Sequence, residues 1–373
     1  MKKERANIAI IGGGVIGIII AEYFLNRGIK DVYIVEKNTK ILRETSSHNS
    51  GLIHGGFDAT PGTLKAKFNV EGRHIFERDY FKEGMPFDWK KISSIILAFN
   101  SEDIKELDKL YDQGIANGLE PSEMRILERE EILAIDPGLN PDVLKAFICY
   151  SSTVIDPVGF GLYLYKRALK HNLHVLLNTK IKKIVQRNGN FILETNNEII
   201  IEADFVINAA GVWAEHIAKM VEENPDFKID TRRGQYRILD PSQAHKVGDN
   251  VYFLTPSKHG KGVIVAKMFS GQVLVGPTAE DGVPLKDIQL TTPKSLELVK
   301  KIGNYIFPSL DMDRTEETFA GSRAINVTNR DFHIAMSNSA PNFLHVAGMQ
   351  SPGLSSAPAI AKYVFELHSK YKI

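Results

Sequence analysis

Cysteine is almost missing from this chain: among 373 residues only Cys149 is a cysteine. A single cysteine excludes an internal disulfide framework and any Cys-x-x-Cys metal or redox motif, and it fits a reducing compartment. The sequence also lacks an uninterrupted apolar run of the ~18 residues that a transmembrane helix needs. These absences predict a soluble, cytoplasmic protein without a transmembrane segment, and they leave only peripheral association with a membrane open.

An excess of charge of one sign is missing as well. The formal net charge is +1, from 46 Lys and Arg against 45 Asp and Glu, and the cations form no stripe along the sequence. Because nucleic-acid binding depends on such a basic patch, no nucleic-acid partner is expected. His, Cys and carboxylate residues are not clustered at metal-ligand spacing, and no nucleophile elbow is present, so neither a metal site nor a serine hydrolase is predicted.

The apolar N-terminal stretch contains a Gly-x-Gly-x-x-Gly motif in a strand-turn-helix context. NIAII predicts a buried strand, VIGIIIAEYFLNRG predicts a helix closed by Gly28, and DVYIVEK predicts a second buried strand ending near Glu36. Gly12 permits the tight turn, Gly14 lets the backbone approach a pyrophosphate, and Gly17 lets helix and strand pack closely. The Glu36 carboxylate would bind the adenosine ribose hydroxyls. The basic head and apolar run are not a signal peptide, because glycines interrupt the run at this functional spacing.

Two later segments decide between NAD and FAD as the dinucleotide. FVINAAGVWAEHIAKMV predicts a strand running into Ala210 and Gly211 and then a helix with Trp213. NFLHVAGMQSPGLSSAPAIAKYVF predicts a strand ending at Gly348, a Gly and Ser loop, and a long helix with Pro358 near its first turn. The positive end of that helix suits the negative charge of a reduced flavin. An NAD-dependent dehydrogenase needs no such third segment, so non-covalent FAD is predicted.

Eight motifs together resemble those of one family. GGGVIG, HNSGLIHGG, NAAGVWA, TRRGQY, HGKGVIV, LVGPTAEDG, FAGSR and AGMQSPGLSSAPAIA resemble the D-amino-acid-oxidase-like FAD-dependent oxidoreductases, and most of all the mycoplasma-type glycerol-3-phosphate oxidases. HNSGxIH is shared with the L-2-hydroxyglutarate oxidases, whereas TRRGQY, HGKGVIV and GSR discriminate between the subgroups. The chain departs from the pattern at Gly55, where Thr is usual, and at Ala324, where Pro usually follows the Arg.

The resemblance implies an α/β fold of the D-amino-acid-oxidase and glutathione-reductase type. A Rossmann-like FAD-binding domain would consist of three segments, 1–80, 145–222 and 325–373. An α+β substrate-binding domain with a mostly antiparallel sheet would be inserted as 81–144 and 223–324. The residue pattern agrees, with strand-like runs at 236–240, 251–257, 261–269 and 272–278 and helical periodicity at 101–118 and 293–307.

A set of cofactor contacts follows from the glycine motif and from the resemblance. The expected FAD contacts are Gly12, Gly14, Ile16, Gly17, Glu36, Lys37, Thr45, Ser46, Ser47, His48, Asn49, Ser50, Ile181, Ala210, Gly211, Gly348, Ser351, Gly353, Leu354 and Ser355. In TRRGQY, Gln235 is expected to face the flavin, while Arg232 and Arg233 are expected to be surface or packing charges. Trp213 is expected in the core.

Oxidation of a secondary alcohol by hydride transfer to flavin N5 requires a base for the hydroxyl proton. Histidine titrates in the useful range, and the resemblance places His54 beside the reactive edge of the flavin. Arg323 carries a planar fork that suits a phosphate or a carboxylate. The resemblance also places Lys261 in the substrate pocket, where it would bind phosphate, hold the alcohol oxygen or help electrons reach oxygen. Ser50 and Ser351 are predicted polar contacts to substrate or flavin.

The sequence therefore predicts an FAD-dependent oxidase that converts sn-glycerol 3-phosphate to dihydroxyacetone phosphate and reduces O2 to hydrogen peroxide. A quinone-linked dehydrogenase keeps the same chemistry with another electron acceptor. The alternatives are an oxidase or dehydrogenase of L-2-hydroxyglutarate or another 2-hydroxy acid, and an amine oxidase of the glycine or sarcosine type. A cofactor-holding module without turnover is the alternative from a different class.

Overall fold

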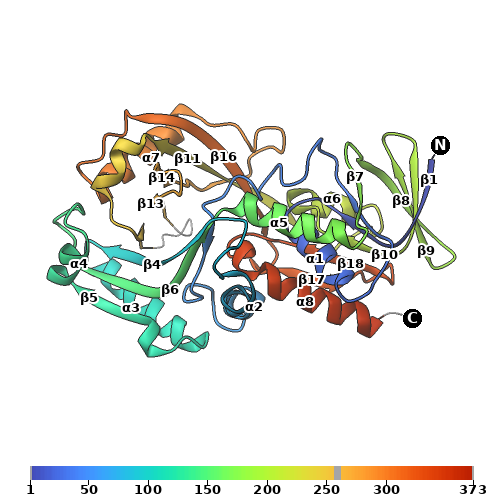
Figure 1. Cartoon of the computed structure of the whole chain (residues 1–373), viewed down its shortest axis with the longest axis horizontal. Helices are drawn as coiled ribbons and strands as arrows, with labels where there is room; N and C mark the ends of the chain where they lie inside the picture. Colours follow the sequence, from blue (N-terminus) through green and yellow to red (C-terminus); the bar gives the residue numbers. More distant parts are fainter. Residues whose placement is uncertain (1, 256–261, 372–373) are drawn as a thin grey trace.

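The computed structural model describes residues 2–255 and 262–371, which form two β-sheets lying one after the other along the long axis of the molecule (Figure 1). In the first sheet the strand order is β17 (His333–Met336), β18 (Phe343–Ala347), β10 (Ile199–Asn208), β1 (Lys2–Ile11), β2 (Val32–Val35) and β7 (His174–Leu176), with β8 (Ile181–Arg187) and β9 (Asn190–Thr195) added beside β10. The pairs from β18 to β7 are all parallel, whereas β17, β8 and β9 pair antiparallel.

The second sheet is mostly antiparallel. Its order is β15 (Glu280–Asp281), β11 (Ile229–Leu239), β14 (Val273–Gly276), β13 (Ile264–Lys267), β12 (Val251–Leu254), β4 (Trp89–Ala98), β6 (Lys145–Ile155) and β3 (Leu52–Ile53), with β16 (Thr315–Asn326) paired to β11 and β5 (Met124–Glu128) to β6. Only the β12–β4 pair of the described strands is parallel here. A first sheet with a parallel core from β18 to β7 and a mostly antiparallel second sheet agree with the predicted Rossmann-like and antiparallel parts.

The helices pack beside these sheets. They are α1 (Val15–Leu25), α2 (Leu64–Ile75), α3 (Ser101–Ala116), α4 (Arg129–Ile135), α5 (Pro157–Lys170), α6 (Ala214–Ala218), α7 (Pro293–Ile306) and α8 (Gly353–Tyr371). Figure 1 shows α1, α5 and α8 beside the first sheet, and α3, α4 and α7 beside the second. Helices α3 and α7 lie within the ranges that the periodicity predicts.

Of the two helix ends that the sequence indicates, the first is confirmed and the second is displaced. The first helix runs to Leu25, and Gly28 closes it at φ +82°, because the Gly28 N–H donates to the Leu25 carbonyl and the Ile29 N–H donates to the Phe24 carbonyl. The last helix begins at Gly353, not near Pro358, because the Ser356 N–H already donates to the Pro352 carbonyl. Pro358 therefore lies inside α8. The helix N-terminus falls directly after the Gly and Ser loop, and the N–H of its first residue, Gly353, donates to the Gln350 carbonyl.

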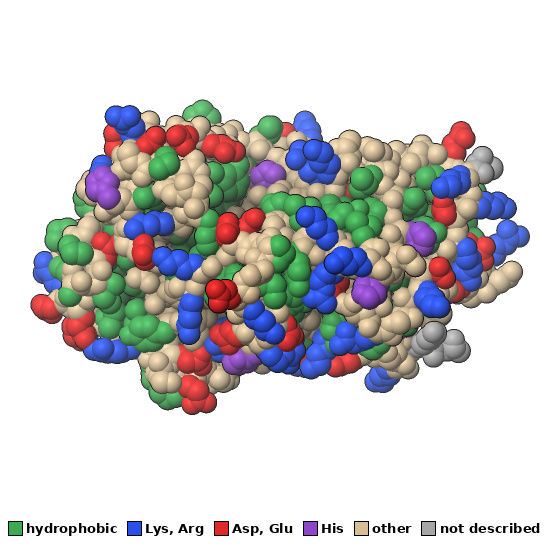
Figure 2. Space-filling model, in the orientation of Figure 1, with side chains coloured by type: hydrophobic (Ala, Val, Ile, Leu, Met, Phe, Trp, Pro, Cys, Tyr) green, Lys and Arg blue, Asp and Glu red, His purple; other side chains and the backbone are tan. Residues whose placement is uncertain are grey.

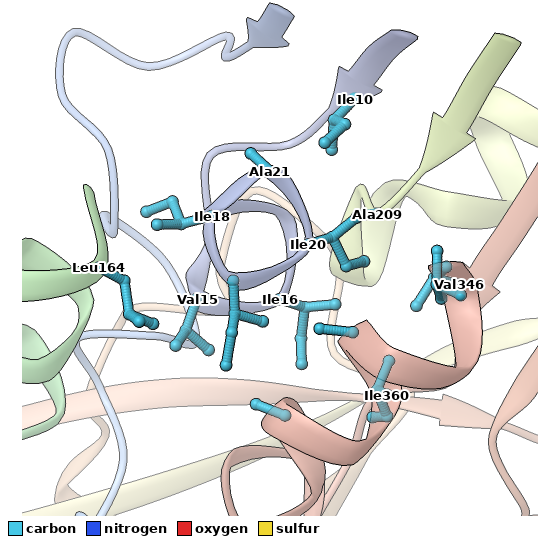
Figure 3. Close-up of a cluster of buried hydrophobic side chains, with 14 of the residues drawn as sticks. Ile10, Val15, Ile16, Ile18, Ile20, Ala21, Leu164, Ala209, Val346 and Ile360 are labelled. Carbon is cyan, nitrogen blue, oxygen red and sulfur yellow. The ribbon is translucent and has the colours of Figure 1, made fainter. Parts of the chain in front are cut away.

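Helix α1 is buried on nearly all sides. Every residue of it except Tyr23 is buried, as expected for a helix that is apolar all round. Figure 3 shows Val15 and Ile16 of α1 between Leu164 of α5 and Ile360 of α8. This packing fixes the position of the α1 N-terminus relative to the ends of the neighbouring strands.

The division into an FAD-binding and a substrate-binding domain stays a prediction. Both β3 and β6 belong to the second sheet, although their residues lie in the segments 1–80 and 145–222 that were expected in the FAD-binding domain.

On the face shown in Figure 2, Lys and Arg side chains are interspersed with Asp and Glu. In the described ranges, no helix is both long enough and apolar enough to cross a membrane.

Candidate active site

A cavity of about 660 Å³ lies where the two sheets meet. From the first sheet its wall takes the residues that follow β1, β2 and β10, including Gly12, Glu36 and Ala210. From the second sheet it takes Tyr236 and Arg323. In open parallel sheets the crevice beyond the carboxyl ends of the strands is the usual ligand site, and the volume is within the range of small-molecule pockets.

The turn between β1 and α1 is built from close backbone contacts that only glycine allows. A Cβ on Gly12, whose φ is +117°, would lie 2.4 Å from the Ala209 carbonyl oxygen. A Cβ on Gly17 would lie 2.1 Å from the Gly12 carbonyl oxygen. The turn is thus locked against both α1 and β10, and the residues at the start of α1, Gly14, Val15 and Ile16, line the cavity. Such a helix N-terminus favours an anion.

Glu36 is held in place by main-chain donors. Its Oε2 accepts the Gly13 N–H at 2.7 Å, and its Oε1 accepts the Asn38 N–H at 2.7 Å. The carboxylate is 8% exposed and lines the cavity. It therefore connects the end of β2 to the glycine turn, and each carboxylate oxygen keeps a further lone pair for a ribose hydroxyl.

The polar run after β2 is fixed by its own hydrogen bonds. Ser46 Oγ accepts the Val15 N–H at 2.9 Å, and Thr45 Oγ1 donates to the Ser322 carbonyl at 2.6 Å. Asn49 Nδ2 donates to the Thr45 and Ser46 carbonyls at 3.1 and 3.0 Å. Because Thr45 reaches β16 and Ser46 reaches α1, this loop ties the glycine turn to the second sheet.

His54 follows the two-residue strand β3 and is 7% exposed. Its Nε2 lies 3.3 Å from Ser351 Oγ, in the loop before α8. Its main-chain N–H donates to Ser355 Oγ at 2.9 Å. All three residues line the cavity. The structure thus brings together the first polar run and the last helix, which are about 300 residues apart in the chain.

Arg323 is the cation best suited to an anionic ligand. It lines the cavity, and within the described ranges no carboxylate pairs with its guanidinium. Burial lowers the pKa of Arg323 from its ordinary value, and the neighbouring Arg232 also lowers this pKa. An anion in the cavity would relieve both effects. Arg232 instead forms a bidentate pair with Asp281, with Nε–Oδ1 and Nη2–Oδ2 distances of 2.5 and 3.0 Å.

The alternation of strand β11 corrects two expectations from TRRGQY. Arg232, Gly234 and Tyr236 line the cavity, so Arg233 and Gln235 point to the other face of the sheet. Gln235 does not face the cavity; its Nε2 donates to Glu280 Oε1 at 2.9 Å and to Thr292 Oγ1 at 3.1 Å. Arg232 was expected to be a surface or packing charge. It lies in the cavity wall because its position on β11 is directly opposite that of Arg323 on β16 in the strand register.

Most of the expected contact residues line this one cavity. They are Gly12, Gly14, Ile16, Glu36, Lys37, Thr45, Ser46, His48, Asn49, Ser50, His54, Ile181, Ala210, Gly211, Arg323, Ser351, Gly353, Leu354 and Ser355. Three others lie beside it: Gly17 packs under the glycine turn, Ser47 Oγ bonds the Glu44 carbonyl at 3.3 Å, and Gly348 packs against Asn326. Lys261 lies outside the described residues.

Several cavity residues were not found from the sequence. Trp213, expected in the core, lines the cavity, and so do Tyr236, Asn329 and Arg330. Lys37 and Lys180 approach the Trp213 ring, with Nζ 5.3 and 5.7 Å from its centroid. Gly211, two residues before Trp213, was a usable signal, because the residues that follow the end of β10 line the same cavity. Asn329 and Arg330 belong to a turn without a recognisable pattern.

These residues fit FAD. The glycine turn between β1 and α1 and the N-terminus of α1 suit a pyrophosphate, and Glu36 suits ribose hydroxyls. The N-terminus of α8 at Gly353 suits the negative edge of a reduced flavin. No group of three or more His, Cys, Asp or Glu side chains that could hold a metal ion occurs in residues 2–255 and 262–371.

Comparison with known proteins identifies the family. The family model for FAD-dependent oxidoreductases (DAO) matches residues 7–367. The chain is 38% identical to the glycerol 3-phosphate oxidase of Mycoplasma genitalium, covering 98% of this chain and 94% of that protein. It is 36% identical to the glycerol 3-phosphate dehydrogenase of Caloramator mitchellensis, covering 97% and 73%. L-2-hydroxyglutarate dehydrogenases are more distant relatives.

The comparison with solved structures agrees. The FAD-bound, dithionite-reduced L-α-glycerophosphate oxidase of Mycoplasma pneumoniae superposes with a TM-score of 0.94 at 36% identity, covering 98% of this chain and 95% of that one. The predicted resemblance, fold and cofactor are thereby confirmed. The chain belongs to the DAO family of FAD-dependent oxidoreductases.

Proposed function

We propose that this enzyme oxidises sn-glycerol 3-phosphate to dihydroxyacetone phosphate. The observation that carries the proposal is the presence of His54 and Arg323 in the wall of one cavity, whose remaining wall fits FAD. A histidine supplies a base for the alcohol, and an arginine without a carboxylate partner in the described ranges supplies a site for the anionic group. The names of relatives at 36 to 38% identity support the same substrate.

The reaction removes a hydride and a proton from the secondary alcohol. FAD, held by the glycine turn and Glu36, would supply flavin N5 as the hydride acceptor, and the proposed electron acceptor, O2, would be reduced to hydrogen peroxide. His54 takes the hydroxyl proton, and Ser351 Oγ, 3.3 Å from its Nε2, orients the imidazole. The burial of His54 excludes bulk water from the base. The C–H bond breaks as the C=O bond forms, so the product is the ketone.

The candidate substrates differ in their anionic group, which is a phosphate in glycerol 3-phosphate and a carboxylate in a 2-hydroxy acid. Arg323 binds either a phosphate or a carboxylate by its fork. A phosphate dianion carries more charge than a carboxylate and favours a second cation, for which we propose Lys261. If Lys261 reads phosphate, Lys261→Ala weakens binding of glycerol 3-phosphate and leaves binding of a 2-hydroxy acid unchanged. Ser50, which lines the cavity, is proposed as a further polar contact.

A substrate panel tests the function. Purified yellow enzyme is mixed anaerobically with glycerol 3-phosphate, L-2-hydroxyglutarate, glycine or sarcosine, and the flavin absorbance near 450 nm is followed. We expect bleaching by glycerol 3-phosphate alone. Bleaching only by the hydroxy acid or by an amine would assign the cavity to that substrate instead. A flavin that every compound leaves oxidised would contradict an oxidoreductase of this substrate class and favour a binding module.

The electron acceptor needs a separate measurement. We propose O2 as the acceptor, with a membrane quinone as the alternative. Turnover with glycerol 3-phosphate is measured by peroxide formation in air and by reduction of a soluble quinone under argon. Peroxide produced in equal amount to dihydroxyacetone phosphate supports the oxidase.

We place the enzyme in the cytoplasm, with peripheral membrane contact as the alternative for a quinone-linked enzyme, and cell fractionation distinguishes the two.

A further inference from the structure

The main-chain groups of His54 are bound from two sides by side chains of different helices. On one side the His54 N–H donates to Ser355 Oγ of α8 at 2.9 Å. On the other side Asn69 Nδ2 of α2 donates to the His54 carbonyl at 2.9 Å. Asn69 and Ser355 are both fully buried. His54 itself comes directly after β3, which is only two residues long, so strand pairing alone does little to fix it.

Asn69 makes this contact at a cost. Because a carbonyl oxygen only accepts, the Asn69 amide must turn its NH2 group toward His54, and its Oδ1 then faces the interior. This Oδ1 has no hydrogen-bond partner among the described residues. A buried amide that leaves its oxygen unbonded is destabilising relative to an apolar side chain of the same shape. Among the described residues, the bond to the His54 carbonyl is therefore the side-chain hydrogen bond that accounts for an asparagine at this position.

The two helices that hold His54 are themselves locked together. A Cβ on Gly72 of α2 would lie 2.1 Å from the Ser355 carbonyl oxygen of α8, so the two backbones touch. Arg73 connects α2 to the second sheet, since its Nη1 lies 2.7 Å from Glu123 Oε1, which in turn contacts Ser151 of β6. The support that Asn69 gives to His54 is thus rigid, not a flexible side chain reaching across solvent.

We propose that Asn69 is a positioning residue for His54, acting together with Ser355. This inference rests on the proposed role of His54 as the base. General-base catalysis depends on the base being within hydrogen-bond reach of the hydroxyl, and a displacement of about 1 Å costs up to about 100-fold in rate. By holding the His54 peptide on both sides, Asn69 and Ser355 set where the imidazole enters the cavity. Asn69 does not line the cavity and touches neither FAD nor substrate through it.

The test uses Asn69→Ala in the FAD-loaded enzyme, with Asn69→Val as the second variant if the first does not fold. Neither side chain can donate a hydrogen bond to the His54 carbonyl, whereas a buried aspartic acid could do so when protonated. Asn140→Ala is the matched control, because Asn140 is buried and its Nδ2 donates to the Tyr305 carbonyl at 2.9 Å, away from the cavity. Flavin content is measured for each variant.

We expect anaerobic flavin reduction by glycerol 3-phosphate to be about tenfold slower in the Asn69 variants, with KM changed less than about twofold. Hydrogen–deuterium exchange of the peptide spanning residues 52–56 should become faster. The control should keep the rate and the exchange of this peptide. Wild-type rate and exchange in the Asn69 variants would overturn the proposal, and so would an equal loss of rate in the control.

The result can be separated from a failure of the proposed function. If glycerol 3-phosphate leaves the wild-type flavin oxidised, the proposed function is wrong. The exchange measurement needs no substrate, so it then tests only whether Asn69 holds His54 in position. Faster exchange at 52–56 in the Asn69 variants supports this role, and unchanged exchange overturns it.

Discussion

Two parts of the cavity wall are built in different ways. At the glycine turn, the atoms in contact are main-chain atoms: Gly17 lies against the Gly12 carbonyl, and Gly12 lies against the Ala209 carbonyl. Around His54, the contacts are side-chain atoms from distant segments, namely Ser351, Ser355 and Asn69. A wall of backbone tolerates only glycine at its close contacts. A wall of side chains can be changed one residue at a time, and each change can be compensated by another.

The largest effect on the rate of flavin reduction is expected from a substitution of His54, in the part of the cavity wall that is built from side chains. His54→Asn removes the proposed base, so flavin reduction by glycerol 3-phosphate should fall about 10²- to 10⁴-fold. FAD should remain bound, because the glycine turn is untouched. Anaerobic stopped-flow absorbance measures the rate. Photochemical reduction of the same variant provides the control, since it needs no base, and it should proceed as in the wild type. A variant that reduces at the wild-type rate would remove His54 from the mechanism.

A substitution at the glycine turn should weaken the binding of FAD. Gly17→Ala places a Cβ 2.1 Å from the Gly12 carbonyl, and no side chain can move to make room. We expect a loss of about 2 to 3 kcal/mol in FAD binding, which is about 30- to 150-fold in Kd. Flavin fluorescence during titration of the apoprotein measures it.

Gly28→Ala is the control for this change. Gly28 follows α1 with φ +82°, and a Cβ added there would meet no other atom within 4 Å, so alanine introduces backbone strain of about 1 kcal/mol without a clash. It should lower the melting temperature and leave the FAD affinity unchanged. Equal affinity losses for the two variants would mean that the close contact at Gly17 is not what forms the pyrophosphate site.

Arg323→Lys should have a smaller effect on the substrate alone. Lysine keeps the positive charge and loses the planar fork, so we expect KM for glycerol 3-phosphate to rise about tenfold with kcat nearly unchanged. The matched control is Arg233→Lys, because Arg233 lies on the other face of the sheet and pairs with Glu280 at 2.5 Å. Steady-state kinetics with both variants checks the assignment. A rise of KM only in the Arg233 variant would contradict it.

The difference between the two walls also explains what could be predicted from the sequence. The glycine turn is local, because strand, turn, helix and acid follow one another within 36 residues, so Gly12, Gly14 and Glu36 were identified by spacing. Motif resemblance also indicated His54 and Arg323. Which face of β11 meets the cavity depends on its register with β16, and the letters RRGQY allow either face, so Arg232 and Gln235 were interpreted the wrong way round. Asn69 gives no signal at all, because it occupies an ordinary position in an amphipathic helix.

Gly55 offers the sharpest comparison with Gly17, although its expected effect is the smallest. A Cβ on Gly55 would lie 2.4 Å from Cys149 Sγ, which is a side-chain atom, and burial raises the pKa of this thiol to about 11, so Cys149 is neutral and packs as a small apolar group. Gly55→Ala should lower the free energy of unfolding by about 1 to 2 kcal/mol through overpacking.

Adding Cys149→Ala removes the clashing sulfur, so the double variant should be more stable than the sum of the two single changes by at least about 0.5 kcal/mol. Urea unfolding of the four proteins in the cycle measures this coupling. Strict additivity would mean that Cys149 already moves aside in the single variant. At Gly17 no partner substitution can produce such a rescue, because the opposing atom belongs to the backbone. Compensation at one glycine and its absence at the other would therefore show that a close contact with a side chain can be relieved by a second substitution, whereas a close contact with the backbone cannot.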